Sequence, residues 1–241
     1  MKYALQLYSV RDCVKDGNFL EILAKVKEAG YEGVEFAGFH GFDAKTLRAE
    51  LDKLGLVCVG AHCGLEDFAG DKLEETLENA KTLGTPQIGI GGCATGTEKD
   101  LTYMLGIMSN AQKRADELGI KTYFHNHTQE FKPTSDGDSD ETIFARIMKA
   151  CYIQVDTYWS FHAGVNTAEF IEENKDKIVT LHIKDGVDGH PVALGEGQND
   201  IPSILAAGDK NGIEWAVVEN DDPFPDGISD VTRSINYLKN L

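Results

Sequence analysis

The chain has 241 residues, of which 41% are hydrophobic and 26% charged, and its formal net charge is −17. This length and composition are typical of a globular protein with a large buried core. The negative charge disfavours nucleic acid and anionic membranes as partners, because both repel a protein of the same sign. Apolar runs stay shorter than the ~18 residues of a membrane helix. Residues 1–5 lack a signal-peptide pattern, so we expect a cytoplasmic protein.

The cysteines also indicate the redox state of the cellular compartment in which the protein is expected. Their number is odd, and no C-x-x-C pair occurs among Cys13, Cys58, Cys63, Cys93 and Cys151. This usage predicts reduced thiols, most of them acting as small buried apolar groups, and gives no support to a catalytic thiol.

Short apolar stretches alternate with longer amphipathic stretches along the chain. The predicted strands are residues 3–10, 33–36, 57–61, 87–90, 122–125, 153–156, 179–182 and 215–219. Their mean spacing of roughly 30 residues is the repeat of a β-α unit. The predicted helices between and after them are residues 18–29, 43–54, 71–83, 98–118, 139–149, 167–175, 200–210 and 229–238.

Four of the predicted helices end in the same way. A glycine follows the helix and the next strand begins soon after it, at Gly30, Gly55, Gly119 and Gly212. Glycine adopts the left-handed conformation that ends many helices without a steric cost. The recurrence of this signal supports a repeating β-α architecture.

Eight β-α units predict an α/β protein, a single-domain (β/α)8 TIM barrel over residues 1–241. The alternative is a doubly wound sheet that binds a dinucleotide. Residues 89–94 match G-x-G-x-x-A only loosely, since the next helix begins near residue 98. No acidic residue ends a strand where ribose binding would require one. The barrel is therefore the favoured fold.

Four predicted strands end in side chains that can bind a metal or move a proton: His125, Asp156, His182 and Glu219. In a (β/α)8 barrel the C-terminal strand ends converge on one mouth, so these groups should meet there. Two imidazoles and two carboxylates suit a divalent cation, which would also offset carboxylate repulsion. We expect Mn²⁺, with Co²⁺, Fe²⁺, Zn²⁺ or Mg²⁺ as alternatives. Each group could instead be a satisfied buried polar residue.

Further polar and aromatic residues lie near the strand ends. We assign catalytic roles to His127 and Lys184 beside Glu219, and substrate-binding roles to Glu35, His62, Trp159 and Glu196. His127 shares a face with His125 if the strand continues, because side chains alternate along a strand. Trp159 could stack on a sugar face or cover the barrel mouth. Lys184 could hold a substrate oxygen or be a solvated surface charge.

At these residues the sequence resembles the sugar phosphate isomerase/epimerase family of the xylose-isomerase-like TIM barrels. The resemblance spans nearly the whole chain, through residues 5–12, 30–35, 125–131, 155–164, 182–185, 194–197 and 218–219. It implies a metal held from strands five to eight, in many members by Glu, Asp, His and Glu. Asp156, His182 and Glu219 match this pattern, whereas the strand-five position is His125.

The resemblance also shows two departures. In metal-dependent ketose epimerases of this family, the glutamates of strands five and eight act as an acid/base pair. This chain keeps Glu219, so His127 or His125 takes the other role or the reaction differs. An arginine often follows the strand-seven H-x-x-D in the epimerases, but here none occurs between Arg146 and Arg233. Phosphate sites favour arginine, so a neutral sugar, polyol or keto-sugar is the expected ligand.

We therefore predict a metal-dependent sugar isomerase or epimerase that transfers a proton next to a carbonyl. Glu219 would remove or return the carbon-bound proton, and His127 would serve the opposite face or the oxygen. A keto-sugar dehydratase, lyase or glycoside-cleaving enzyme is the alternative, followed by a non-catalytic sugar-binding barrel. The net charge argues against a related metal nuclease. The expected partner is a carbohydrate, and the exposed helices could also pair in a homodimer.

Overall fold

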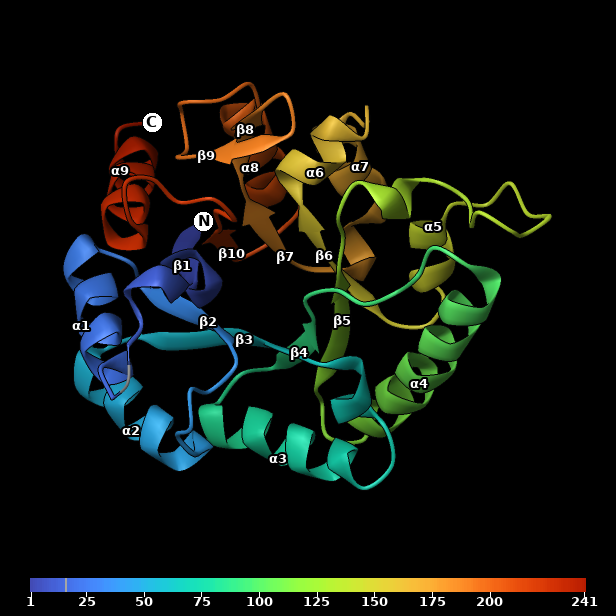
Figure 1. Ribbon diagram of the computed structural model, residues 1–241, viewed down its shortest axis with the longest axis horizontal. Coiled ribbons are helices and arrows are strands. Elements are labelled where there is room, and N and C mark those ends of the chain that lie inside the picture. Colours follow the sequence, from blue (N-terminus) through green and yellow to red (C-terminus); the bar gives the residue numbers. More distant parts are fainter. Residues whose placement is uncertain (16) are drawn as a thin grey trace.

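The computed structural model describes residues 1–15 and 17–241, and it confirms the predicted barrel. Parallel strands close in the order β1-β10-β7-β6-β5-β4-β3-β2 (Figure 1). They are β1 Lys2–Gln6, β2 Gly33–Ala37, β3 Val57–Cys63, β4 Gln87–Ile90, β5 Lys121–His125, β6 Tyr152–Asp156, β7 Ile178–Ile183 and β10 Trp215–Val218. Closure of the sheet excludes the doubly wound alternative.

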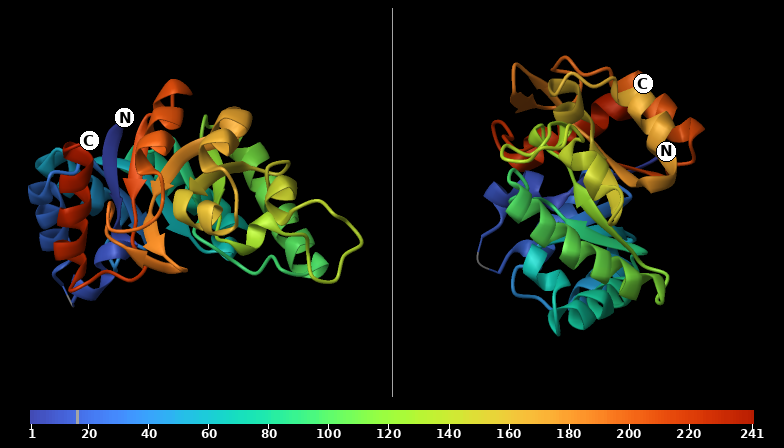
Figure 2. Two further views of the ribbon diagram at one scale, coloured as in Figure 1. Left: turned by 90° about the horizontal axis from the view of Figure 1, so that it is seen from above. Right: turned by 90° about the vertical axis from the view of Figure 1, so that its right-hand side faces the viewer.

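Helices surround this barrel, and both termini lie on the same side of it, close to the last helix (Figure 2). The α-helices are α1 Phe19–Ala29, α2 Ala44–Leu54, α3 Lys72–Leu83, α4 Glu98–Asp116, α5 Ile143–Ile147, α6 Thr157–His162, α7 Thr167–Asn174, α8 Ile201–Lys210 and α9 Gly227–Lys239. Short 3-10 turns are η1 Leu7–Cys13, η2 Leu65–Phe68, η3 Gln129–Phe131 and η4 Lys175–Lys177. In the described part of the chain, every helix is too short or too polar to cross a membrane.

The predicted glycine signals are confirmed. The backbone φ angles of Gly30, Gly55, Gly119 and Gly212 are 109°, 64°, 69° and 73°. These lie in the left-handed region, where a side chain would add strain. Each glycine thus ends its helix and turns the chain back toward the barrel.

Some element boundaries differ from the prediction. β1 ends at Gln6 rather than at residue 10, because the Gln6 side chain accepts the backbone N–H of Tyr8 and begins η1. Helix α5 is shorter than expected, since its N-cap is Thr142 rather than Ser139 or Asp140. Capping side chains therefore set both boundaries.

One helix and one two-stranded hairpin at the barrel mouth were not predicted. Helix α6 begins directly after β6, where the Asp156 carboxylate accepts the backbone N–H of Trp159 as an N-cap. Strands β8 Asp185–Val187 and β9 His190–Val192 form an antiparallel hairpin after β7. Its turn residues Asp188 and Gly189 have φ angles of 51° and 87°. This matches the Asp-Gly pair that two-residue hairpin turns favour.

The barrel interior is layered. Most buried apolar side chains form one large cluster, and Ala4, Val59 and Val217 form a separate small one. Ala4 shares a strand face with Gln6, and Val217 shares one with the position of Glu219, because side chains alternate along strands. The small apolar cluster therefore lies one layer below the polar groups at the mouth.

All five cysteine thiols are free, as expected from the sequence, but only Cys58 and Cys151 are buried, so the expectation that most of them are buried was wrong. Burial raises the pKa of Cys58 and of Cys151 to about 12, so both thiols are protonated and unreactive at neutral pH.

Candidate active site

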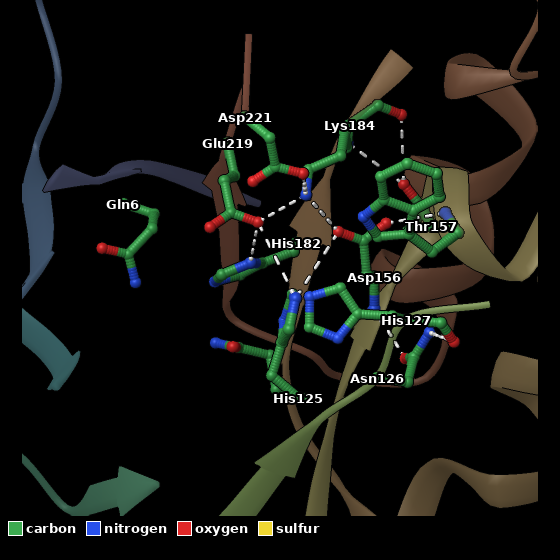
Figure 3. Close-up of polar contacts among 12 residues, drawn as sticks. Gln6, His125, Asn126, His127, Asp156, Thr157, His182, Lys184, Glu219 and Asp221 are labelled. Atoms are coloured by element: carbon green, nitrogen blue, oxygen red, sulfur yellow. Dashed lines mark hydrogen bonds and ion pairs between the residues drawn. The ribbon is translucent and has the colours of Figure 1, made fainter. Parts of the chain in front are cut away.

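The structure brings the four predicted strand-end residues together. One ligand atom from each of His125, Asp156, His182 and Glu219 lies within 4.8 Å of the others. All four residues are buried, although His125 and Glu219 also line a cavity. They come from the ends of β5, β6 and β7 and from the residue after β10, and Figure 3 shows them converging.

Lys184 lies at the centre of this cluster rather than at the surface. Its Nζ atom is 2.8 Å from Asp156 Oδ2, 2.7 Å from Glu219 Oε2 and 2.8 Å from Asp221 Oδ2. Burial alone would lower the pKa of Lys184, but the carboxylates of Asp156, Glu219 and Asp221 raise it above its ordinary value. The side chain is therefore a buried ammonium, which corrects the alternative of a solvated surface charge.

Asp221 is a site residue that the sequence reasoning missed. Its segment was read only as a loop, yet its carboxylate binds Lys184 and lines the cavity. An available signal was its position two residues after Glu219, just beyond the end of β10.

His182 is held between two carboxylates. Its Nδ1 lies 2.9 Å from Glu219 Oε2, and its Nε2 lies 2.5 Å from Glu35 Oε2. Burial would lower the pKa of His182, but the Glu219 and Glu35 carboxylates raise it to about 10. With Lys184, it gives the site a second buried positive charge.

Glu35 lies below the mouth and is fully buried. Besides His182, it accepts hydrogen bonds from Gln6 at 2.8 Å, the Tyr123 hydroxyl at 2.5 Å and the Gln154 amide at 2.8 Å. Burial would raise the pKa of Glu35, but His62 and His182 lower it to about 2. The Glu35 carboxylate therefore positions His182. It does not line the cavity, and its predicted contact with substrate stays a prediction from the sequence.

Two further imidazoles of the site are neutral. Burial, with a further contribution from the neighbouring His182, lowers the pKa of His125 well below its usual range. Burial also lowers the pKa of His62, whose Nε2 lies 2.8 Å from the Gln154 side-chain oxygen. Neutral imidazoles are the form that binds metals and accepts protons.

A cavity of about 520 Å³ opens above these groups, a volume that suits a small ligand. Its lining includes Tyr8, Ala37, His62, Cys63, Gly91, Gly92, His125, His127, Glu219 and Asp221. His62, His127 and Glu219 were predicted to contact substrate or to transfer protons, and the structure places all three on its wall.

The other two predicted substrate residues lie elsewhere. Trp159 is half-buried and is not among the lining residues, and its ring centre lies 5.5 Å from Lys184 Nζ. Glu196 is exposed and binds Arg233 at 2.8 Å, away from the cavity. The chain turns there because the Asp185 carboxylate accepts backbone N–H groups of Gly195 and Gly197. Glu196 therefore lies outside the cavity lining, and its contact with substrate stays a prediction from the sequence.

The donor groups fit a divalent cation in both chemistry and spacing. His125 Nε2 lies 3.7 Å from Asp156 Oδ2 and 3.8 Å from Glu219 Oε2. Two ligands that are each ~2.1 Å from one tetrahedral ion lie about 3.4 Å apart. His125 Nδ1 has no hydrogen-bond partner among the described residues. Asp156 Oδ2 and Glu219 Oε2 also contact the Lys184 ammonium. A divalent cation that binds these oxygens would therefore lie next to an existing positive charge.

These features define a parallel (β/α)8 barrel with a buried cluster of carboxylates, imidazoles and one ammonium at its C-terminal mouth. Residues 23–241 match the family described as the xylose isomerase-like TIM barrel, and the chain belongs to that family. The resemblance seen in the sequence is thereby confirmed. No curated protein matches the chain.

Several solved structures share the fold. A sugar phosphate isomerase/epimerase from Parabacteroides distasonis is 21% identical, with a TM-score of 0.84 over 100% of this chain and 99% of that one. A probable 3-DHS dehydratase from Bacillus anthracis is 16% identical, with a TM-score of 0.76 over 100% and 99%. An L-ribulose 3-epimerase is 15% identical, with a TM-score of 0.75 over 100% and 94%. At these identities the likeness shows the fold alone.

Proposed function

We propose that the protein is a metal-dependent sugar isomerase or epimerase that transfers a proton next to a carbonyl. The observation that carries this proposal is the carboxylate of Glu219, which faces a cavity lined by the imidazoles of His62, His125 and His127 and by a second carboxylate, Asp221. Such a wall offers proton-accepting and proton-donating groups around one small ligand.

Glu219 is suited to remove the carbon-bound proton. Burial would raise its pKa, but Lys184 and His182 lower it well below the usual range, so the group is a carboxylate at neutral pH. In the described part of the chain, all its side-chain polar contacts use Oε2. The other oxygen, Oε1, is left to accept a proton from a ligand in the cavity.

The remaining groups complete the transfer. The positive charge of Lys184 would stabilise negative charge that develops on an enediolate oxygen. His127, on the cavity wall, would donate a proton to the opposite face or to the neighbouring carbon, giving epimerisation or isomerisation. A divalent cation, with Mn²⁺ as the first candidate, would be held by His125, Asp156, His182 and Glu219 and would supply Lewis-acid polarisation of the carbonyl. His182 would have to lose its proton to act as one of these ligands, so the cation would then take the place of the imidazolium charge.

The proposed substrate is a neutral ketose rather than a sugar phosphate. The cavity lining contains no lysine or arginine among the described residues. Arg11 lies next to Tyr8 and Asp221 of that lining, but it already donates to their backbone carbonyls at 2.9 and 2.6 Å. A phosphate would therefore lack the bidentate cationic partner that such groups favour.

Solvent exchange tests this proposal directly. In D₂O with Mn²⁺, the wild-type protein should incorporate deuterium next to the carbonyl of ketoses such as L-ribulose or D-allulose, as followed by proton NMR. Glu219→Gln should slow this exchange at least 100-fold, because it removes the proton acceptor. The matched control is Glu214→Gln, which alters an exposed residue just before the opposite end of β10. Exchange that persists in Glu219→Gln would contradict the proposed role.

Elimination from a keto-sugar is the second candidate, as a dehydratase, lyase or glycoside-cleaving reaction. It is favoured by the pairing of one carboxylate with imidazoles, since an imidazolium can protonate a departing hydroxyl or aglycone. The same NMR assay separates the two reactions, because elimination gives an unsaturated product and isomerisation does not. A cytoplasmic location and a homodimer stay predictions from the sequence.

A further inference from the structure

Lys184 occupies the position at which a metal would meet the Asp156 and Glu219 carboxylates. We propose that its ammonium is a built-in cation that competes with a divalent metal for these two groups. The inference rests on the metal site of the proposed function, but it concerns occupancy of that site and not turnover.

The competition follows from shared atoms. Lys184 Nζ contacts Asp156 Oδ2 at 2.8 Å and Glu219 Oε2 at 2.7 Å. The same two oxygens are the ones nearest to His125 Nε2, at 3.7 and 3.8 Å. They are therefore the atoms that would complete a metal site with His125. An ammonium and a divalent cation repel each other, so both cannot hold these oxygens together.

The buried carboxylates need a cation even without a metal. Asp156 is fully buried and Glu219 is 5% exposed, and uncompensated charges at such depth destabilise a fold strongly. Lys184 supplies the compensating charge from within the chain, because it follows β7 directly and is itself fully buried. The site can therefore fold in its assembled form before any metal binds.

Lys184 also has a second set of contacts that it could keep after leaving the two carboxylates. Asp221 Oδ2 lies 2.8 Å from Nζ, and Asp221 lines the cavity with a side chain that is 31% exposed (Figure 3). The Trp159 ring lies 5.5 Å from Nζ, within reach of a cation–π contact. Displacement by a metal would thus move the ammonium toward the cavity wall, where it could meet a substrate oxygen.

The consequence is a measurable reduction in metal affinity. A metal that must first displace Lys184 binds more weakly than it would to the vacated carboxylates, as for any ligand that binds a minor state. Removing the ammonium should therefore strengthen metal binding. A residue that merely supports the fold would have no such effect, or the opposite one.

The test is calorimetric titration of Mn²⁺ into the full-length, chelator-treated protein. Lys184→Met and Lys184→Gln remove the ammonium, and we expect each to lower the Kd for Mn²⁺ at least tenfold. Lys72→Met is the matched control, since it removes the same charge from a side chain that is 63% exposed and bound to Asp67. Its Kd should stay within twofold of the wild-type value.

The outcomes are distinct. Binding that appears only when Lys184 is replaced would support the competition in its strongest form. An unchanged or higher Kd in the Lys184 variants would overturn it, and Lys184→Gln decides the question if Lys184→Met does not fold. If none of the four proteins binds Mn²⁺, the competition and the metal part of the proposed function both fail. Wild-type Mn²⁺ binding and ketose exchange, with an unchanged Kd in the variants, would overturn the competition alone.

Discussion

Glu35 and His182 join opposite walls of the barrel. Glu35 Oε2 on β2 lies 2.5 Å from His182 Nε2 on β7, and these strands are not neighbours in the sheet. The contact therefore crosses the interior and fixes the ring so that Nδ1 faces Glu219 at 2.9 Å. Carboxylates that orient a histidine in this way are common behind metal-binding imidazoles.

Glu35→Gln should destabilise the protein by about 3 kcal/mol, because it leaves a buried imidazolium with one carboxylate instead of two. Urea denaturation measures the loss. The control is Glu32→Gln, an exposed position next to the same strand, which should change stability by less than about 0.5 kcal/mol. Equal effects of the two substitutions would show that the Glu35–His182 contact contributes little.

His127→Gln should separate the two halves of the proposed reaction. If Glu219 removes the proton and His127 supplies the new one, the variant keeps solvent exchange at the substrate carbon. Formation of the isomer or epimer should fall about 100-fold. NMR of substrate and product measures both rates in one sample. His162→Gln, at an exposed position on α6, is the control and should leave both unchanged. Normal product formation in His127→Gln would remove this residue from the mechanism.

Metal removal should lower both activity and thermal stability. Saturating Mn²⁺ at 100 times its Kd adds about 2.7 kcal/mol to the free energy of unfolding, because the metal binds the folded state alone. Differential scanning calorimetry before and after dialysis against a chelator measures the shift in Tm. Asp156→Asn should abolish the increase with Mn²⁺, whereas Asp209→Asn, at an exposed carboxylate that is 74% accessible, should retain it. A normal increase in Asp156→Asn would exclude Asp156 as a ligand.

The acid dependence of stability should include a contribution from Glu98 on α4, which binds Arg146 of α5 at 2.9 Å. Hydrogen bonds from Arg146 and Thr134 lower the pKa of Glu98 from 4.5 to about 2. The folded-state pKa is depressed, so the stabilisation is present above pH 4.5 and is lost as the pH falls toward 2. The urea midpoints of wild type and Glu98→Gln should therefore differ at pH 6 and converge near pH 2.

Arg146→Gln provides the complementary test, because it removes the other partner of the same pair. The urea midpoint of Arg146→Gln should approach that of the wild type as the pH falls from 6 to 2. At pH 6 the double variant should be little less stable than either single variant. A gap between Glu98→Gln and wild type that stays constant down to pH 2 would show that the pair does not titrate as described.

Much of the fold was accessible from sequence because its signals are local. Helix-ending glycines such as Gly30 and Gly55 depend on backbone sterics within a few residues. Element boundaries were less accessible, since side-chain caps such as Gln6 and Thr142 compete with equally plausible neighbours. The Asp188–Gly189 hairpin carried a recognisable turn signal, but it follows β7 so closely that the alternating β-α pattern obscured it.

The candidate site likewise contains residues that the sequence identified and residues that it did not. His125, Asp156, His182 and Glu219 were identified because each stands at the end of an apolar strand, and barrel closure brings such ends together. Glu196 was expected near the other site residues but lies outside the cavity lining, because no comparable rule places loop side chains. Asp221 was missed for the same reason, although it lies beside Glu219 in sequence and beside Lys184 in space.

The sequence by itself therefore determined the barrel and the residue types at its mouth, since periodicity, capping and strand-end chemistry are properties of short segments. The tertiary structure alone decided how those residues are paired. Distances of 2.5 to 2.9 Å between groups on, or directly after, different strands place Glu35 behind His182 and Lys184 between Asp156 and Glu219. Burial makes such pairings decisive, because removal from water strengthens charge interactions and makes an unpaired charge costly.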